Sequence, residues 1–113
     1  MLVFKQKETT PEKISINLER RITNLNNLMV VVCDFTNGPA PRSDPPHSHT
    51  HEQITYVAEG KLFLFLDEEK HLLTEGDVFT IPSGVQHCIQ TVSKHVRLVD
   101  SFSPVREDFL KRG

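Results

Sequence analysis

Short apolar segments separated by turn residues run through most of this chain, and this pattern limits its fold more than any other feature. Gly, Pro, Asp and Glu residues stand between the segments. Between residues 54 and 102, we expect six segments to form strands: 54–58, 61–66, 72–73, 77–81, 86–92 and 95–102. No helical period appears before residue 103. Many short strands with frequent turns are typical of a sandwich or barrel, so we predict an all-β fold.

The two ends of the chain are expected to add a few more elements. Isoleucine and leucine alternate with polar residues over 14–18, which predicts one half-buried strand, and residues 2–4 could form another. Residues 28–35 are apolar on both faces, which suits a strand in the middle of the molecule or at a subunit interface. Near the end, Ser103 is predicted to cap a short helical turn that has Pro104 at its first position.

Length and charge exclude several kinds of protein. The chain has 113 residues, which fits one domain spanning 1–113. Thirteen Lys and Arg against 15 Asp and Glu give a net charge of −2 without a basic block, so we expect no nucleic-acid partner. The longest apolar run has six residues, 28–33, and no signal-peptide region is recognised at the start. We therefore expect no membrane partner and a cytoplasmic location.

The two cysteines, Cys33 and Cys88, lie far apart in the sequence and form no Cys-x-x-Cys pair. This spacing gives little support to thiol redox chemistry or to a disulfide scaffold, and it predicts two buried free thiols. His87 and Cys88 are also not expected to act as a nucleophile pair, because neighbouring residues of a strand face opposite sides of a sheet.

A histidine-rich stretch carries the clearest chemical signal. Within seven consecutive residues stand three histidines and two possible oxygen ligands: His47, His49, His51, Glu52 and Gln53. In an extended segment, a His-x-His pair points both rings to one side, so one transition-metal ion can bind both. A continuous strand from His47 to Gln53 would span roughly 20 Å, too far for one coordination sphere. If Gln53 is a ligand, the chain must turn after His49.

Two spaced motifs resemble those of the cupin family. The first is His47-x-His49-x(3)-Gln53-x(6)-Gly60, and the second is Gly76-x(5)-Pro82-x-Gly84-x(2)-His87. The resemblance implies a double-stranded β-helix, the cupin jelly-roll barrel, with one divalent transition-metal ion inside. The implied ligands are His47, His49, Gln53 and His87, and the ion could be nickel, zinc, iron, manganese or cobalt.

The motifs differ from the usual family pattern at two positions. Gln53 stands where most members have Glu, and Thr91 stands where the second motif often ends in Asn. A neutral amide gives less charge to the ion than a carboxylate, so the ion should keep more Lewis acidity and bind less tightly. Glu52 is the alternative oxygen ligand, and His51 is expected at the pocket rim or behind the ligands.

The remaining histidines, His71 and His95, lack a partner at ligand spacing. We expect both of them to be surface residues.

A second signal lies close to the C-terminus. Asp100 and Phe102 share one strand face with Val96 and Leu98, so this face is expected to look inward. An inward carboxylate is costly unless it is paired, close to a metal or catalytic. Phe102 could then wall a ligand pocket and Arg106 could bind a carboxylate through paired hydrogen bonds. The alternative is a solvated Asp100, a core Phe102 and a surface Arg106.

These residues extend the resemblance to the KdgF-like cupins of pectin degradation. The shared patterns are P-H-S-H-x-H-E-Q-I-T-Y-V over residues 46–57 and D-x-F-x-P-x-R-x-D over residues 100–108. The resemblance implies an isomerase-type enzyme that converts 4,5-unsaturated uronate monosaccharides into linear ketonised sugars. Asp100 would be the general acid and base, Arg106 would bind the carboxylate of this carbohydrate, and Phe102 would shape the pocket.

The same fold and motifs are compatible with other functions. A metal-dependent cupin dioxygenase and a non-catalytic sugar-binding cupin are the alternatives to the uronate enzyme. By analogy with small cupins, the doubly apolar stretch 28–35 and the N-terminal strand also predict a homodimer.

Overall fold

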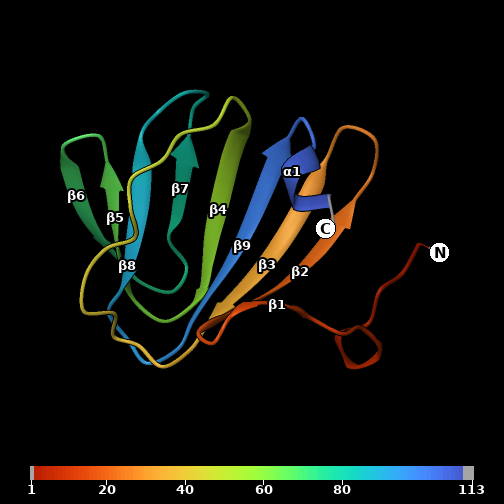
Figure 1. Ribbon diagram of the computed structural model, residues 1–113, viewed down its shortest axis with the longest axis horizontal. Helices are drawn as coiled ribbons and strands as arrows, with labels where there is room; N and C mark the ends of the chain where they lie inside the picture. Colours follow the sequence, from red (N-terminus) through yellow and green to blue (C-terminus); the bar gives the residue numbers. More distant parts are fainter. Residues whose placement is uncertain (1, 111–113) are drawn as a thin grey trace.

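The computed structural model describes residues 2–110 and contains two antiparallel β-sheets that share one core (Figure 1). The larger sheet has the strand order β1-β2-β3-β9-β4-β7, and the smaller sheet has the order β6-β5-β8. The strands are β1 (Glu12–Ser15), β2 (Leu18–Asn24), β3 (Met29–Phe35), β4 (Glu52–Glu59), β5 (Leu62–Leu66), β6 (Glu69–Leu73), β7 (Val78–Ile81), β8 (His87–Thr91) and β9 (Val96–Ser103). A 3₁₀ turn, η1 (Gln6–Glu8), precedes them, and a short helix, α1 (Glu107–Leu110), follows.

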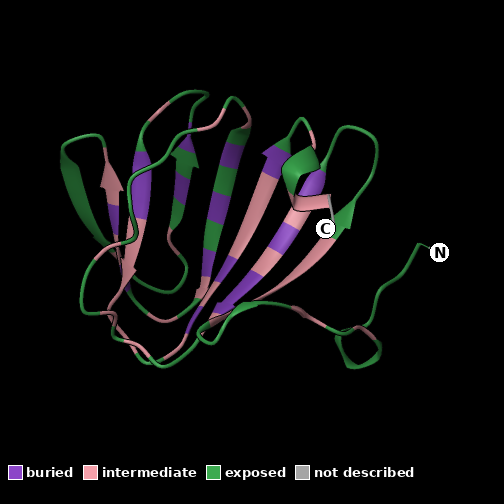
Figure 2. Ribbon diagram, in the orientation of Figure 1, coloured by how far each residue is buried: buried purple, intermediate pink, exposed green. Residues whose placement is uncertain are grey.

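Both sheets contribute side chains to a single hydrophobic core. Val31 and Val57 of the larger sheet and Leu62 and Leu64 of the smaller sheet are at most 1% exposed. Buried and exposed residues alternate along β4 and β7, as the banding in Figure 2 shows, because strand side chains point to opposite faces in turn. Every second residue of the larger sheet therefore points into the interior, and the candidate site uses this face.

The turn between β4 and β5 requires glycine at position 60. Gly60 has a φ of +84°, and a Cβ atom built there would lie 2.2 Å from the carbonyl oxygen of His95. Both the backbone conformation and this contact exclude larger residues. The glycine of the first motif thus has a structural role in closing the turn.

The predicted all-β fold is confirmed, and strands over 28–35 and 54–102 match the expected segments closely. The N-terminal predictions are wrong in two places. Residues 2–4 form no strand, and residues 14–18 are not one strand, because Ile16 and Asn17 form the turn between β1 and β2. Ile16 is 79% exposed there. The alternation of apolar and polar residues therefore continues through a turn, where the apolar side chain is not buried.

The C-terminal helix is present but begins later than predicted. Ser103 is the last residue of β9 and pairs with Glu52 of β4, so its backbone belongs to the sheet. The helix starts at Glu107, three residues after Pro104. The expected cap at Ser103 is therefore wrong, because strand pairing extends through that residue. Over residues 2–110, no helix has both the length and the apolar character needed to cross a bilayer.

The loop between β3 and β4 carries the histidine stretch from the larger sheet toward the smaller sheet. There His47 pairs with His87 at the start of β8 through two backbone hydrogen bonds of 2.8 and 3.0 Å. The chain then bends at Thr50 and His51 before β4 begins. The turn expected between His49 and Gln53 is therefore present, and it brings Gln53 back toward the histidines.

Candidate metal centre

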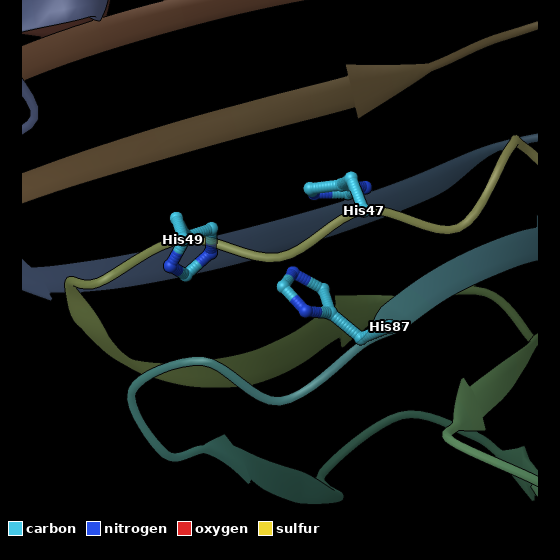
Figure 3. Close-up of side chains that lie close together, drawn as sticks. All are labelled: His47, His49 and His87. Carbon is cyan, nitrogen blue, oxygen red and sulfur yellow. The ribbon is translucent and has the colours of Figure 1, made fainter.

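Three histidine rings gather at one point inside this arrangement (Figure 3). His47 and His49 come from the loop and His87 from the start of β8, and their candidate ligand nitrogens all lie within 4.8 Å of one another. His87 is buried and His49 half-buried, whereas His47 is exposed. Of the expected histidine ligands, all three are brought together.

Backbone carbonyl groups orient two of these rings. His49 donates from Nδ1 to the oxygen of His51 at 2.9 Å, and His87 donates from Nδ1 to the oxygen of Val85 at 2.9 Å. A carbonyl can only accept, so Nδ1 carries the hydrogen and Nε2 of the neutral ring has a free lone pair. Burial, followed by the nearby His47 and His49, lowers the pKa of His87. The neutral form, which a metal needs, is thereby favoured.

Gln53 completes the group with an amide oxygen. Its Oε1 lies 3.1 Å from Nε2 of His49, while its Nε2 donates to the hydroxyl of Thr55 at 2.9 Å. Two atoms that both present lone pairs therefore face each other without a hydrogen between them. A bound cation satisfies such an arrangement, so the side chains present fit a divalent transition-metal ion. Imidazole and amide donors suit several such ions and do not identify one.

The two other candidates of the histidine stretch lie elsewhere. Glu52 is exposed and precedes the buried Gln53 on β4, so its side chain faces away from the histidine cluster. His51 is outside the three-histidine cluster and contributes its carbonyl group to orient His49. Gln53, rather than Glu52, is therefore placed to supply the oxygen.

A cavity of about 210 Å³ opens beside the cluster. Its lining combines metal-site residues with the C-terminal candidates, and the polar and aromatic members that matter most are His47, Gln53, His87, Asp100, Phe102 and Arg106. Its volume is below the roughly 300–1,000 Å³ of pockets for drug-sized molecules, which suits a small ligand. Residues almost fifty positions apart in the sequence thus share one cavity.

Asp100 points inward from β9, as predicted, and lies directly opposite Thr55 of β4. The Thr55 hydroxyl donates to Oδ1 of Asp100 at 2.7 Å, and the Cys33 thiol approaches Oδ2 at 3.7 Å. Burial raises the pKa of Asp100, although hydrogen bonds from Thr55 and Cys33 and the charge of Arg106 oppose the shift. A raised pKa helps a carboxyl group both to accept and to release a proton.

Phe102 and Arg106 also lie where the sequence predicted them. The Phe102 ring is 2% exposed, and its centroid lies 5.8 Å from that of His49 in an edge-on contact. The Arg106 guanidinium lies 5.3 Å from the Phe102 centroid and pairs with Asp108 at 2.8 Å. Its side chain is only 15% exposed. Of the alternative, Phe102 as a core residue is confirmed, because Phe102 belongs to the buried hydrophobic core. A solvated Asp100 and an ordinary surface Arg106 do not agree with the hydrogen bond from Thr55 to Asp100 and the low exposure of Arg106.

Three residues near the site were not predicted from the sequence. Thr55 and Cys33 contact Asp100, and Arg20 lines the same cavity. Arg20 had a detectable signal, because it alternates with Leu18 and Ile22 and so shares their strand face. The two cysteines are free and buried, as predicted.

The two remaining histidines have different surroundings. His71 is exposed and contacts only Glu69 among the groups described here. His95 contacts both Asp34, at 3.0 Å, and Glu59, at 2.7 Å, and is therefore more than the simple surface residue that was expected. Neither lies in the three-histidine cluster.

Three imidazole rings and an amide oxygen, held within two antiparallel sheets that share a core, define a metal-binding β-barrel protein of the jelly-roll type. Residues 35–102 match the Cupin domain family, and this matched region is more than half of the chain. The chain belongs to the cupin family and is a KdgF-like member of it.

Two KdgF proteins show this similarity over almost the whole chain. The pectin degradation protein KdgF of Dickeya dadantii is 34% identical over 109 residues, which are 95% of this chain and 96% of that protein. The solved structure of KdgF from Halomonas sp. has a TM-score of 0.85 and 30% identity, covering 94% of this chain and 97% of that one. The matched region therefore extends over almost the whole chain.

A third relative is similar over a shorter region. Quercetin 2,3-dioxygenase of Bacillus subtilis is 47% identical over 53 residues, which are 47% of this chain and 15% of that enzyme. The similarity is therefore local and does not extend over either whole protein.

Proposed function

We propose that this protein is a metal-dependent isomerase that converts 4,5-unsaturated uronate monosaccharides into linear ketonised sugars during polysaccharide degradation. One cavity is lined by the metal-site residues His47, Gln53 and His87 together with Asp100 and Arg106, and this co-location is the main support. A full-length relative named as a pectin degradation protein supports the substrate class. The cavity's small volume agrees with a monosaccharide.

The chemistry requires proton movements without any loss of atoms. The hydroxyl on C1 gives up its proton, the bond between C1 and the ring oxygen breaks with its electron pair going to that oxygen, and an aldehyde and an enolate result. The enolate then becomes a ketone when C4 gains a proton. In this proposal, the Asp100 carboxylate accepts the first proton and delivers one to C4, so it is regenerated. Its raised pKa suits both roles.

The other residues bind and orient the sugar. Residues His47, His49, Gln53 and His87 would hold the ion, which when bound supplies Lewis acidity toward sugar oxygens. Arg106 binds the substrate carboxylate, and the buried Phe102 ring forms an apolar wall that keeps the sugar beside Asp100.

The proposal is tested by following the alkene ultraviolet absorbance of a 4,5-unsaturated galacturonate. Metal-loaded wild-type protein should accelerate the loss of absorbance well above the spontaneous rate. Asp100→Asn should lower kcat by roughly 10²–10⁴-fold, because proton transfer by a positioned carboxyl group contributes that much, while the metal content stays the same.

A matched control makes the same chemical change at an exposed turn. Asp67 has a φ of +50°, which asparagine also tolerates, and it does not line the cavity. Asp67→Asn should therefore react at the wild-type rate. Wild-type protein that gives no acceleration over the spontaneous reaction would overturn the proposal.

A cupin dioxygenase is the second candidate, and the local similarity to quercetin 2,3-dioxygenase is the observation in its favour. Oxygen uptake by the metal-loaded protein, measured with quercetin and with the unsaturated uronate, distinguishes the two. The isomerase requires no oxygen and should run at the same rate under anaerobic conditions. A non-catalytic sugar-binding cupin would bind the uronate and leave its absorbance unchanged.

We also propose that the protein is a homodimer and acts in the cytoplasm. Ile54, Tyr56 and Val78 on the outer face of the larger sheet are 48–57% exposed, which is unusual for large apolar residues on neighbouring strands. The unpaired thiols of Cys33 and Cys88 agree with a reducing compartment.

A further inference from the structure

Arg20 is a charged residue on the inner face of the larger sheet. On β2 it pairs in register with Cys33 of β3, whose side chain is buried and contacts Asp100. Leu18 and Ile22 on the same face pack against the hydrophobic core. An inward arginine is costly among such neighbours unless its charge has a use or a partner.

The contacts of Arg20 leave part of its guanidinium group available. Its Nε donates to Oε1 of Glu12 on β1 at 2.7 Å, and the guanidinium lies 4.2 Å from the centroid of the Phe109 ring. The side chain is 17% exposed. Over residues 2–110, its two terminal nitrogens form no hydrogen bond, and Arg20 lines the cavity beside the metal centre.

Arg106 stands against the same aromatic ring but has less capacity to bind a ligand. Its guanidinium lies 4.0 Å from the Phe109 centroid. Two of its three nitrogens, Nε and Nη2, already donate to Asp108 at 3.3 and 2.8 Å. Among the described residues, Nη1 is the one Arg106 nitrogen without a hydrogen bond, whereas Arg20 offers both terminal nitrogens in a planar pair that matches a carboxylate.

The charge of the cavity also favours an anion. With a divalent ion at the histidines, the charges that line the cavity are the ion, Arg20 and Arg106 against Asp44 and Asp100, while Glu12 and Asp108 pair with the arginines from outside the lining. Two guanidinium groups that share one small, partly buried cavity repel each other, and an anionic ligand between them removes that cost.

We propose that Arg20 is a second carboxylate-binding residue, whose terminal N–H groups hold the acid group of a sugar acid together with Arg106. The inference deepens the proposed function, on which its choice of ligand rests. It assigns to Arg20, from the first third of the chain, a part in selecting uronates over neutral sugars.

The test measures binding of D-galacturonate and of D-galactose to the metal-loaded protein by calorimetry. Galacturonate has the acid group but no alkene, so it reports binding without the proposed reaction. Wild-type protein should bind galacturonate more tightly than galactose. Arg20→Gln should weaken galacturonate binding at least about tenfold and leave galactose binding unchanged, because it removes a charge-assisted pair of hydrogen bonds. With the unsaturated uronate, its KM should rise by a similar factor while kcat stays within about twofold.

Glu12→Gln is the matched control, because it breaks the same ion pair but keeps the guanidinium group. Glu12 does not line the cavity, so this variant should bind galacturonate at least as tightly as wild-type protein. Equal losses in the two variants, or wild-type binding by Arg20→Gln, would overturn the role of Arg20. Selective galacturonate binding that depends on Arg20, without faster ketonisation, would overturn the proposed reaction and leave this inference standing.

Discussion

Thr55 joins the metal centre to the proposed acid and base through one hydroxyl group. It accepts a hydrogen bond from the Gln53 amide and donates one to Asp100, and it is completely buried. This direction of donation fixes the amide so that Oε1, the atom able to bind a cation, faces His49. A glutamate at position 53 could not donate to Thr55, so the chain of hydrogen bonds explains why an amide suits this site.

Thr55→Val should lower the affinity for Zn²⁺ by roughly 10–100-fold, the usual cost of removing a group that orients a metal ligand. Valine has nearly the same shape, so the change removes the hydroxyl without opening a large cavity. The affinity is measured by competition with a chromophoric chelator, and Thr55→Ser should restore most of it.

Thr80→Val is the control for this change, since Thr80 is exposed on the outer face of β7. Its Zn²⁺ affinity should equal that of wild-type protein. If Thr55→Val bound Zn²⁺ with wild-type affinity, the amide would be oriented by other contacts and the role given to Thr55 would be wrong.

At the residue scale, the spacing of the two motifs was sufficient to predict the three-histidine cluster. The two-residue period of a strand was sufficient to predict that Asp100 points inward. Local spacing predicted the pair His47 and His49, whereas His87 was assigned through the resemblance to the second cupin motif. Thr55 and Arg20 could not be assigned in this way. Their importance depends on the register between strands, which places Thr55 opposite Asp100 and Arg20 opposite Cys33.

Asp34 connects three strands on the outer side of the larger sheet. From β3 it accepts hydrogen bonds from Arg97 of β9 at 2.8 and 3.2 Å and from His95 at 3.0 Å, and Arg21 of β2 lies 3.6 Å away. His95 in turn contacts Glu59 at the end of β4. Asp34 and its partners therefore connect β2, β3 and β9, and His95 extends the connection to the end of β4.

The stability of the protein should depend on pH through Asp34. Burial alone would raise the pKa of Asp34, but hydrogen bonds from Arg97 and His95 outweigh it, and the folded-state pKa is lowered. The stabilisation is therefore complete above the unfolded-state pKa of about 3.9 and is lost as the pH falls through the lower, folded-state pKa. Asp34→Asn should reduce the free energy of unfolding at pH 7 by about 2 kcal/mol or more and flatten its decline below about pH 4.

Urea unfolding at a series of pH values measures both effects. Glu69→Gln provides the comparison, because Glu69 pairs with His71 at a site where its side chain is 73% exposed. Such an exposed pair contributes little to the free energy of unfolding, so this variant should unfold like wild-type protein at pH 7. An Asp34→Asn variant with the wild-type acid slope would exclude Asp34 as the source of the pH dependence.

At the scale of the elements, periodicity was a good guide wherever a strand had one buried face. It was misleading over 14–18, where isoleucines continue through the tight turn between β1 and β2. Residues 19–24 of β2 were missed because charged residues interrupt the apolar pattern: Arg20 faces the cavity, and Arg21 faces the Asp34 cluster. A strand that contains charged residues with specific partners is therefore not predicted by hydrophobic periodicity.

At the scale of the whole molecule, exposed apolar residues gather on the outer face of the larger sheet. Tyr56 of β4 lies between Val78 of β7 and Val99 of β9, and Ile54 stands beside it on the same face. Contiguous exposed apolar residues on neighbouring strands are typical of a protein–protein interface. The same face of β3 continues the surface through Val32, in agreement with the doubly apolar pattern seen in its sequence.

We expect this surface to form the homodimer, so wild-type protein should have twice the mass of one chain by light scattering. Ile54→Lys should yield a monomer, because it places a charge within the apolar surface, beside Tyr56, where desolvation is costly. The residue is 54% exposed in the single chain, so the monomer itself should fold normally. Leu72→Lys, at a 60% exposed position on β6 of the other sheet, should remain a dimer. A monomeric wild-type protein, or a dimer that persists in Ile54→Lys, would show that this face is not the interface.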